Sequence, residues 1–133
     1  MRRVLIAVGV LALIFLIGYV PQRLNAERAR RENTRLQLEL GLARLQGKLG
    51  MMSYEASRNN FANAAALSTE FFTGLRDGLA NPRLAGDSSR AATLSAIAAR
   101  RDEVTADLAR GDPAVKEKLA ELYKQFSEAL AGH

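Results

Sequence analysis

An uncharged apolar segment near the N-terminus constrains this chain more than any other feature. Residues Val4 to Val20 read VLIAVGVLALIFLIGYV, seventeen positions of which twelve are Val, Leu, Ile or Phe. These side chains contribute about −4 to −7 kcal/mol of insertion free energy near a bilayer centre. As a helix the segment spans about 25 Å, at the short end for a membrane crossing. The segment therefore predicts a single transmembrane helix over residues 4–20.

Two other interpretations of this segment are open. A buried core helix would need a larger surrounding core than 133 residues provide. A cleaved secretory signal fits the basic Arg2 and Arg3 and a cleavage region at Leu24-Asn25-Ala26, and cleavage would release a secreted helical protein. The apolar run is longer than the about 7–15 residues of a signal, and Arg23 lies where that region should be neutral. We therefore expect a retained anchor.

The net charge of +5 is concentrated beside the apolar segment. Two arginines precede the segment, and residues 22–35 carry five arginines and two glutamates. From Leu36 onward, twelve basic and twelve acidic side chains give no net charge. This distribution predicts a lipid-bilayer partner for residues 4–20 and no nucleic-acid partner, since no basic face is expected on the folded domain. The predicted membrane-interface residues are Arg2, Arg3, Tyr19, Arg23, Arg28, Arg30 and Arg31.

The orientation of such an anchor depends on which signal is weighed. Counting Lys and Arg near the segment gives two on the N-terminal side and five on the C-terminal side, which favours a cytoplasmic C-terminal domain. A short basic tail before an uncleaved signal anchor favours the opposite orientation. We expect a cell-membrane protein with its N-terminus inside and its C-terminal domain outside, in the periplasm.

The remainder of the chain predicts helices and no strands, so the expected fold class is all-α. Residues 21–36 are too polar to bury and predict a basic helical stalk. A heptad seam with spacings of 4-3-4-3-4 follows. Its members are Leu38, Leu42, Leu45, Leu49, Met52 and Ala56.

Three boundaries divide the region after this seam. Arg58-Asn59-Asn60 predicts a turn before a second helix from Phe61 to Leu79. Asn81-Pro82 ends that helix, and Pro82 to Gly86 is expected to form a loop. A third helix is expected from Asp87 or Ser88 to Leu108. Gly111-Asp112-Pro113 predicts the start of the last helix, with Pro at its first position.

Short connections make consecutive helices antiparallel neighbours. We therefore expect a helical bundle over residues 37–131, with about four helices including the C-terminal half of the stalk helix. Residues 1–3 and 132–133 are expected to be tails.

The residues needed for chemistry are scarce. The sequence has no cysteine, and its one histidine, His133, is the final residue. Zinc and haem sites are therefore not expected. No Gly-rich phosphate loop is present, and the serines lack a base other than lysine. We expect no enzyme activity, no catalytic or metal site and no cofactor.

Two features are candidate partner-binding sites. Arg101 falls within the apolar arc of the expected third helix, where it could pack its stem on the core and reach Glu55 or Glu70, or bind an acidic partner. The second feature is an aromatic cluster with Tyr54, which could be core or a groove for a partner helix. Its phenylalanines are Phe61, Phe71 and Phe72.

Two functional classes remain. The favoured one is an adaptor or scaffold that mediates protein–protein interaction at a bacterial-type membrane, with another membrane or envelope protein as partner and with oligomerisation through the stalk. The alternative is a membrane-tethered module that binds a lipid or small apolar molecule. A cavity larger than about 300 Å³ would favour this alternative.

Overall fold

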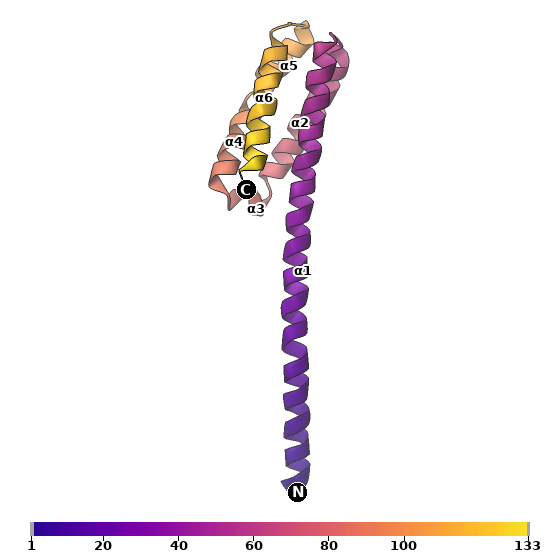
Figure 1. Cartoon of the computed structure of the whole chain (residues 1–133), viewed down its shortest axis with the longest axis vertical. Helices are drawn as coiled ribbons and strands as arrows, with labels where there is room; N and C mark the ends of the chain where they lie inside the picture. Colours follow the sequence, from indigo (N-terminus) through magenta and orange to yellow (C-terminus); the bar gives the residue numbers. More distant parts are fainter. Residues whose placement is uncertain (1, 133) are drawn as a thin grey trace. The chain divides into compact units, whose positions relative to one another are not determined.

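The computed structural model describes the backbone of residues 2–132 and the side chains of residue 4, residues 6–17 and residues 23–132. Throughout this part the chain is helical and has no strand, which confirms the all-α prediction (Figure 1). The helices are α1 (Arg2–Ser57), α2 (Phe61–Leu79), α3 (Pro82–Ala85), α4 (Ser88–Ala99), α5 (Arg101–Arg110) and α6 (Val115–Ala131).

The chain divides into two compact units, residues 1–37 and residues 38–133. The first unit consists of the N-terminal part of α1, where every described side chain is exposed. Residues 21–36, expected as a stalk, belong to this helix.

The predicted transmembrane helix is wrong. In the described part of the chain, no helix combines the length and the apolar character that a membrane crossing requires. The expected cell-membrane location, with its N-in orientation, is corrected by the same finding. The side chains of residue 5 and of residues 18–22, which belong to or border the expected segment, lie outside the described residues.

The second unit is a helical bundle whose core contains the predicted seam of α1. Leu42, Leu45, Leu49, Met52 and Ala56 are buried, and Leu38 packs at the edge. The other helices add thirteen apolar side chains to the same core, twelve from α2, α4, α5 and α6 and one from the short α3. They are Ala64, Phe71, Phe72, Leu75, Leu84, Leu94, Ile97, Val104, Leu108, Val115, Leu119, Leu122 and Phe126.

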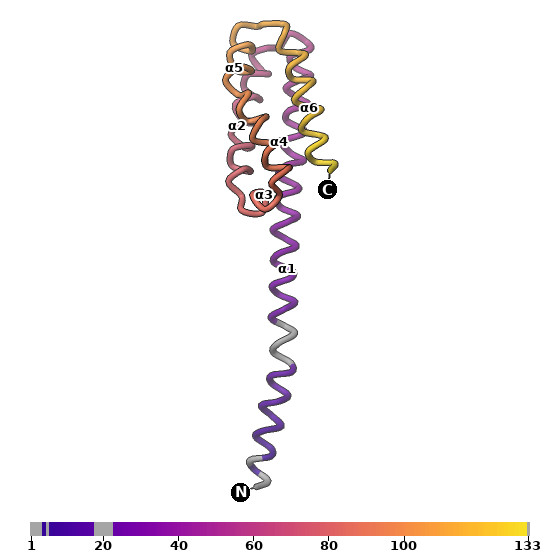
Figure 2. The backbone as a smooth tube through the Cα atoms, turned by 90° about the vertical axis from the view of Figure 1, so that its left-hand side faces the viewer, coloured from indigo at the N-terminus to yellow at the C-terminus, as the bar shows by residue number. Residues whose placement is uncertain are grey.

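Antiparallel packing places α2 against α5 and α4 against α6. Figures 1 and 2 show α4 and α5 following one another along the bundle, so that the pair takes the place of one helix. Together with α2, α6 and the C-terminal part of α1, they give the four-helix arrangement that the sequence predicts.

Local chemistry explains where the helices end. Asn59 and Gly111 adopt positive φ angles of 63° and 64°, the left-handed conformation that reverses the chain after a helix. Asp87 Oδ1 accepts a hydrogen bond of 3.1 Å from the N–H of Arg90 at the start of α4. Asp112 Oδ1 accepts one of 2.9 Å from the N–H of Ala114 before α6. These side chains satisfy N–H groups that have no partner within the helix.

Three boundaries differ from the prediction. The expected loop after Asn81 contains the short helix α3, because Asn81 caps it and Pro82 presets its first φ angle. The expected third helix is divided at Arg100, whose φ and ψ of −85° and 2° are not helical. The last helix begins at Val115, two residues after Pro113.

Candidate interaction surface

The exposed apolar side chains of the bundle lie on two of its helices. Among the described residues 38–132, the exposed large hydrophobic side chains are Leu40 at 51%, Met51 at 58% and Tyr54 at 58% on α1, and Tyr123 at 40% on α6. None of them lies on α2, α3, α4 or α5. A concentration of this kind is typical of an interaction surface. We call this surface, formed by α1 from residue 38 onward and by α6, the α1–α6 face.

Helical periodicity explains why α1 is apolar on two sides. Successive residues of an α-helix are rotated by about 100°, so a residue two positions from the core seam points away from the core. Leu40 lies two positions after Leu38, and Tyr54 lies two positions after Met52. The bundle therefore uses one face of α1 and leaves the opposite face apolar and exposed.

A groove of about 410 Å³ runs between α1 and α6. Small side chains form much of its floor, and a Cβ atom at Gly50 would lie 3.3 Å from Cε2 of Tyr123. The volume of the groove exceeds the about 300 Å³ that would favour a ligand-binding module. However, the groove is open along the surface. A small-molecule pocket encloses most of its ligand, which this groove does not do. Its lining residues are Gly50, Ser53, Tyr54, Ser57, Ala120 and Tyr123.

Hydrogen bonds fix the level of α6 along α1. Gln46 Nε2 donates to Ser127 Oγ at 2.9 Å. Beyond the end of α1, Lys116 Nζ donates to Asn59 Oδ1 at 2.8 Å. Low residue numbers on one helix therefore meet high numbers on the other, so the two helices are antiparallel.

Two exposed charged residues, Arg58 and Glu117, lie at one end of the α1–α6 face, each next in sequence to a member of the Asn59–Lys116 contact. Arg58 places its guanidinium carbon 5.4 Å from the ring centroid of Tyr54 and donates from Nη1 to Tyr54 Oη at 3.3 Å. Glu117 lies in the first turn of α6 and is exposed. The face thus carries a positive charge on α1 and a negative charge on α6 at one level.

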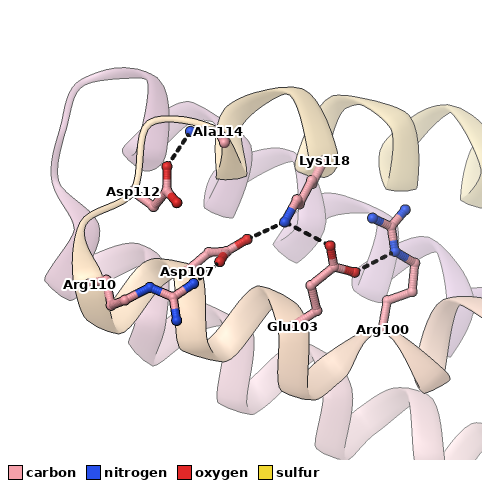
Figure 3. Close-up of polar contacts among 7 residues, drawn as sticks. All are labelled: Arg100, Glu103, Asp107, Arg110, Asp112, Ala114 and Lys118. Carbon is pink, nitrogen blue, oxygen red and sulfur yellow. Dashed lines mark hydrogen bonds and ion pairs between the residues drawn. The ribbon is translucent and has the colours of Figure 1, made fainter.

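An ionic network fastens the other side of α6 to α5 (Figure 3). Lys118 Nζ lies 2.7 Å from Glu103 Oε1 and 2.5 Å from Asp107 Oδ2. Arg110 pairs with the buried Asp107, and Arg100 Nε donates to Glu103 Oε2 at 3.2 Å. The bonds from Lys118 and Arg100 lower the pKa of Glu103, and the bonds to Asp107 and Glu103 raise the pKa of Lys118.

A second ion pair joins α1 to α4. Arg90 is buried, and its Nη1 and Nη2 donate to Glu39 Oε1 and Oε2 at 2.8 and 2.9 Å. This bidentate hydrogen bonding raises the pKa of Arg90 above its ordinary value. The Nε of Arg90 is buried without a hydrogen-bond partner.

The described arginines of the expected membrane interface are all exposed. Arg23, Arg28, Arg30 and Arg31 lie on α1 within the first unit. The side chains of Arg2, Arg3 and Tyr19, and the whole of His133, lie outside the described residues.

The candidate residue Arg101 is exposed on α5 and does not reach either expected carboxylate. Glu55 accepts a hydrogen bond of 2.6 Å from Asn60, and Glu70 pairs with Lys48. The interpretation that Arg101 packs its stem on the core is therefore wrong. The division of the third helix at Arg100 is the reason, because it interrupts the periodicity that placed Arg101 on the buried arc. Binding of an acidic partner by Arg101 stays a prediction.

The three candidate phenylalanines belong to the interior rather than to an exposed groove. Phe71 and Phe72 are buried, with Phe71 in edge contact with Phe72 at 5.0 Å and with Phe126 at 5.7 Å between ring centroids. Phe61 is half-buried and packs against the core. The aromatic-core interpretation holds for these residues, whereas Tyr54 separates from them onto the α1–α6 face.

Two further observations bear on chemistry. Among the described residues, no group of three or more His, Cys, Asp or Glu side chains is arranged to hold a metal ion. A hollow of about 230 Å³ lies between α4 and α6 and has a mixed polar and apolar lining. Its residues are Ser89, Arg90, Thr93, Gln125, Glu128, Ala129 and Gly132.

Comparisons with family models, curated proteins and solved structures gave no match for this chain. Its functional assignment therefore depends on its own surface.

Of the exposed hydrophobic residues on this surface, Tyr54 was named from the sequence, whereas the other three were missed. Leu40 and Met51 are apolar residues outside the core seam of α1, and Tyr123 is an aromatic residue beside the seam of α6. A second apolar stripe on a helix that already has one is a signal that the sequence contains. The buried Arg90 also follows a visible pattern, because it precedes Leu94 by four positions and Ile97 by seven.

Proposed function

We propose that this protein is a helical adaptor or scaffold that mediates protein–protein interaction through the α1–α6 face. One observation carries the proposal: in the described bundle, exposed large hydrophobic side chains occur on α1 and α6 and on no other helix. Tyr and Met are enriched in protein interfaces, and small residues between two helices allow a partner helix to approach closely.

The open shape of the groove supports a macromolecular partner over a small molecule. Tyr54 and Tyr123 border the groove and are 58% and 40% exposed, so each presents part of its ring together with a hydroxyl group. Side chains of this kind supply contact area at low conformational-entropy cost.

Site-specific photocrosslinking tests the proposal. A photoreactive phenylalanine analogue in place of Tyr123 should form covalent adducts with another polypeptide in the cells that make the protein. The matched control carries the same analogue in place of Thr73, an exposed residue of α2. Protein adducts from position 123 but not from position 73, identified by mass spectrometry, support an adaptor. Equal yields at the two positions, or adducts at neither, would contradict it.

A further inference from the structure

We infer that the α1–α6 face binds the same face of a second copy of this chain. This inference rests on the proposed function, because it names the partner of the surface proposed there. The antiparallel alignment of α1 and α6 and the charges along them make the face complementary to itself.

The alignment sets which residues lie at the same level. Gly50 faces Tyr123, and Asn59 contacts Lys116. A two-fold axis parallel to these helices, placed over the groove, keeps every level and exchanges the two sides of the face. It therefore lays α1 of one copy over α6 of the other, and the same contact occurs twice.

The charges match in this arrangement. Arg58 lies next to Asn59, and Glu117 lies next to Lys116, so the two charged side chains share one level. In the described part of a single copy, Arg58 and Glu117 do not form an ion pair with each other. Across the two-fold axis, Arg58 of each copy faces Glu117 of the other, which gives two ion pairs of opposite charge.

The apolar residues match as well. The same levels place Tyr54 of one copy over Ala120 of the other, and Met51 over Tyr123. A Cβ atom at Gly47 would meet nothing within 4 Å, so the outer surface of α1 is open there to close approach by a helix. An isologous dimer would thus bury each of these exposed apolar side chains twice, once per copy.

A second copy is favoured over a foreign helix by this self-complementarity. The face itself supplies both members of each ion pair and both the large and the small residues that oppose one another. A foreign partner would have to provide a negative charge, an alanine and an aromatic side chain at the same spacing.

Charge reversal in separate chains tests the inference. R58E places two glutamates opposite each other in a homodimer, and E117R places two arginines opposite each other. Each variant alone should raise the dimer dissociation constant about tenfold, corresponding to about 1.4 kcal/mol. An equimolar mixture should restore wild-type affinity, because a heterodimer of the two variants recovers both attractive pairs.

The measurement is sedimentation equilibrium of the full chain, with circular dichroism to verify that each variant is folded. The matched control is R76E, a reversal at an exposed arginine of α2, which should leave the dissociation constant unchanged. All variants retain residues 1–37, so association through that unit would be equal in every sample. Failure of the mixture to recover, or loss of affinity in R76E equal to that in R58E, would overturn the inference.

The same experiments separate this inference from the proposed function. A wild-type chain that sediments as a monomer, combined with adducts from position 123 to a different protein, would overturn the second-copy inference and leave the adaptor proposal standing. A monomer with no protein adducts would overturn both.

Discussion

The Arg90–Glu39 pair should be strongly asymmetric when its two partners are removed separately. The side chain of Arg90 is 5% exposed, whereas that of Glu39 is 43% exposed. E39A leaves a buried guanidinium without its carboxylate, and we expect a loss of about 2–3 kcal/mol of unfolding free energy. R90M keeps an apolar stem in the same space and leaves a glutamate that water can reach, so we expect a loss of about 1 kcal/mol or less.

Urea unfolding followed by circular dichroism at 222 nm measures both values. For a chain of this size, a loss of 2–3 kcal/mol corresponds to a decrease of about 1–2 M in the urea midpoint. The matched control is E70A, which breaks the exposed pair between Lys48 of α1 and Glu70 of α2 and should cost about 0.5 kcal/mol.

The double variant E39A/R90M completes the comparison. It should be more stable than E39A alone, because it removes the buried charge together with its partner. A loss in R90M equal to that in E39A, or a loss in E39A no larger than that in E70A, would contradict the expected asymmetry.

Three further predictions concern the bundle. The pKa of Glu103 is lowered from 4.5, so the stability that its ion pairs contribute is lost as the pH falls through the lowered pKa. The pKa of Lys118 is raised from 10.5, so the stability that its ion pairs contribute is lost as the pH rises through the raised pKa. Urea midpoints from pH 3 to pH 11 should decrease less at both extremes in K118M than in the wild type. G78A should gain about 0.5–1 kcal/mol of unfolding free energy, because a Cβ atom there meets nothing within 4 Å. G111A should lose about 1 kcal/mol, because Gly111 has a left-handed φ angle. Thermal melts of the two variants should therefore shift in opposite directions. L49A should cost about 2–5 kcal/mol by leaving a cavity in the core, and an unchanged urea midpoint would contradict the position of Leu49 at zero exposure.

Periodicity made much of the bundle predictable. The core seam of α1 and the boundaries of α2 follow from the spacing of apolar residues and from Asn59 and Pro82, whose preferences are local. The division between α4 and α5 was not predictable. Glycine and proline are the residues that usually mark a helix break, and the break falls at Arg100. The interruption at Arg100 therefore has no local signal of this kind in the sequence.

The burial of charged residues was harder to predict than the apolar core. A charged residue on an apolar stripe, such as Arg90 or Arg101, is buried only if the fold brings a partner to it. Glu39, the partner of Arg90, lies 51 positions earlier on a different helix. The composition of residues 4–20 favoured an anchor, whereas no helix in the described part of the chain has the length and apolar character of a membrane crossing.

The two left-handed turns have a consequence for how the bundle opens. Lys116, after the second turn, donates to Asn59 in the first, and a Cβ atom on Gly111 would lie 3.5 Å from the ring of Phe61. Neither turn can separate from the other without breaking these contacts, so their amides should share one local unfolding reaction. Native-state hydrogen exchange should show similar protection in both turns, and K116M should lower that protection in both together.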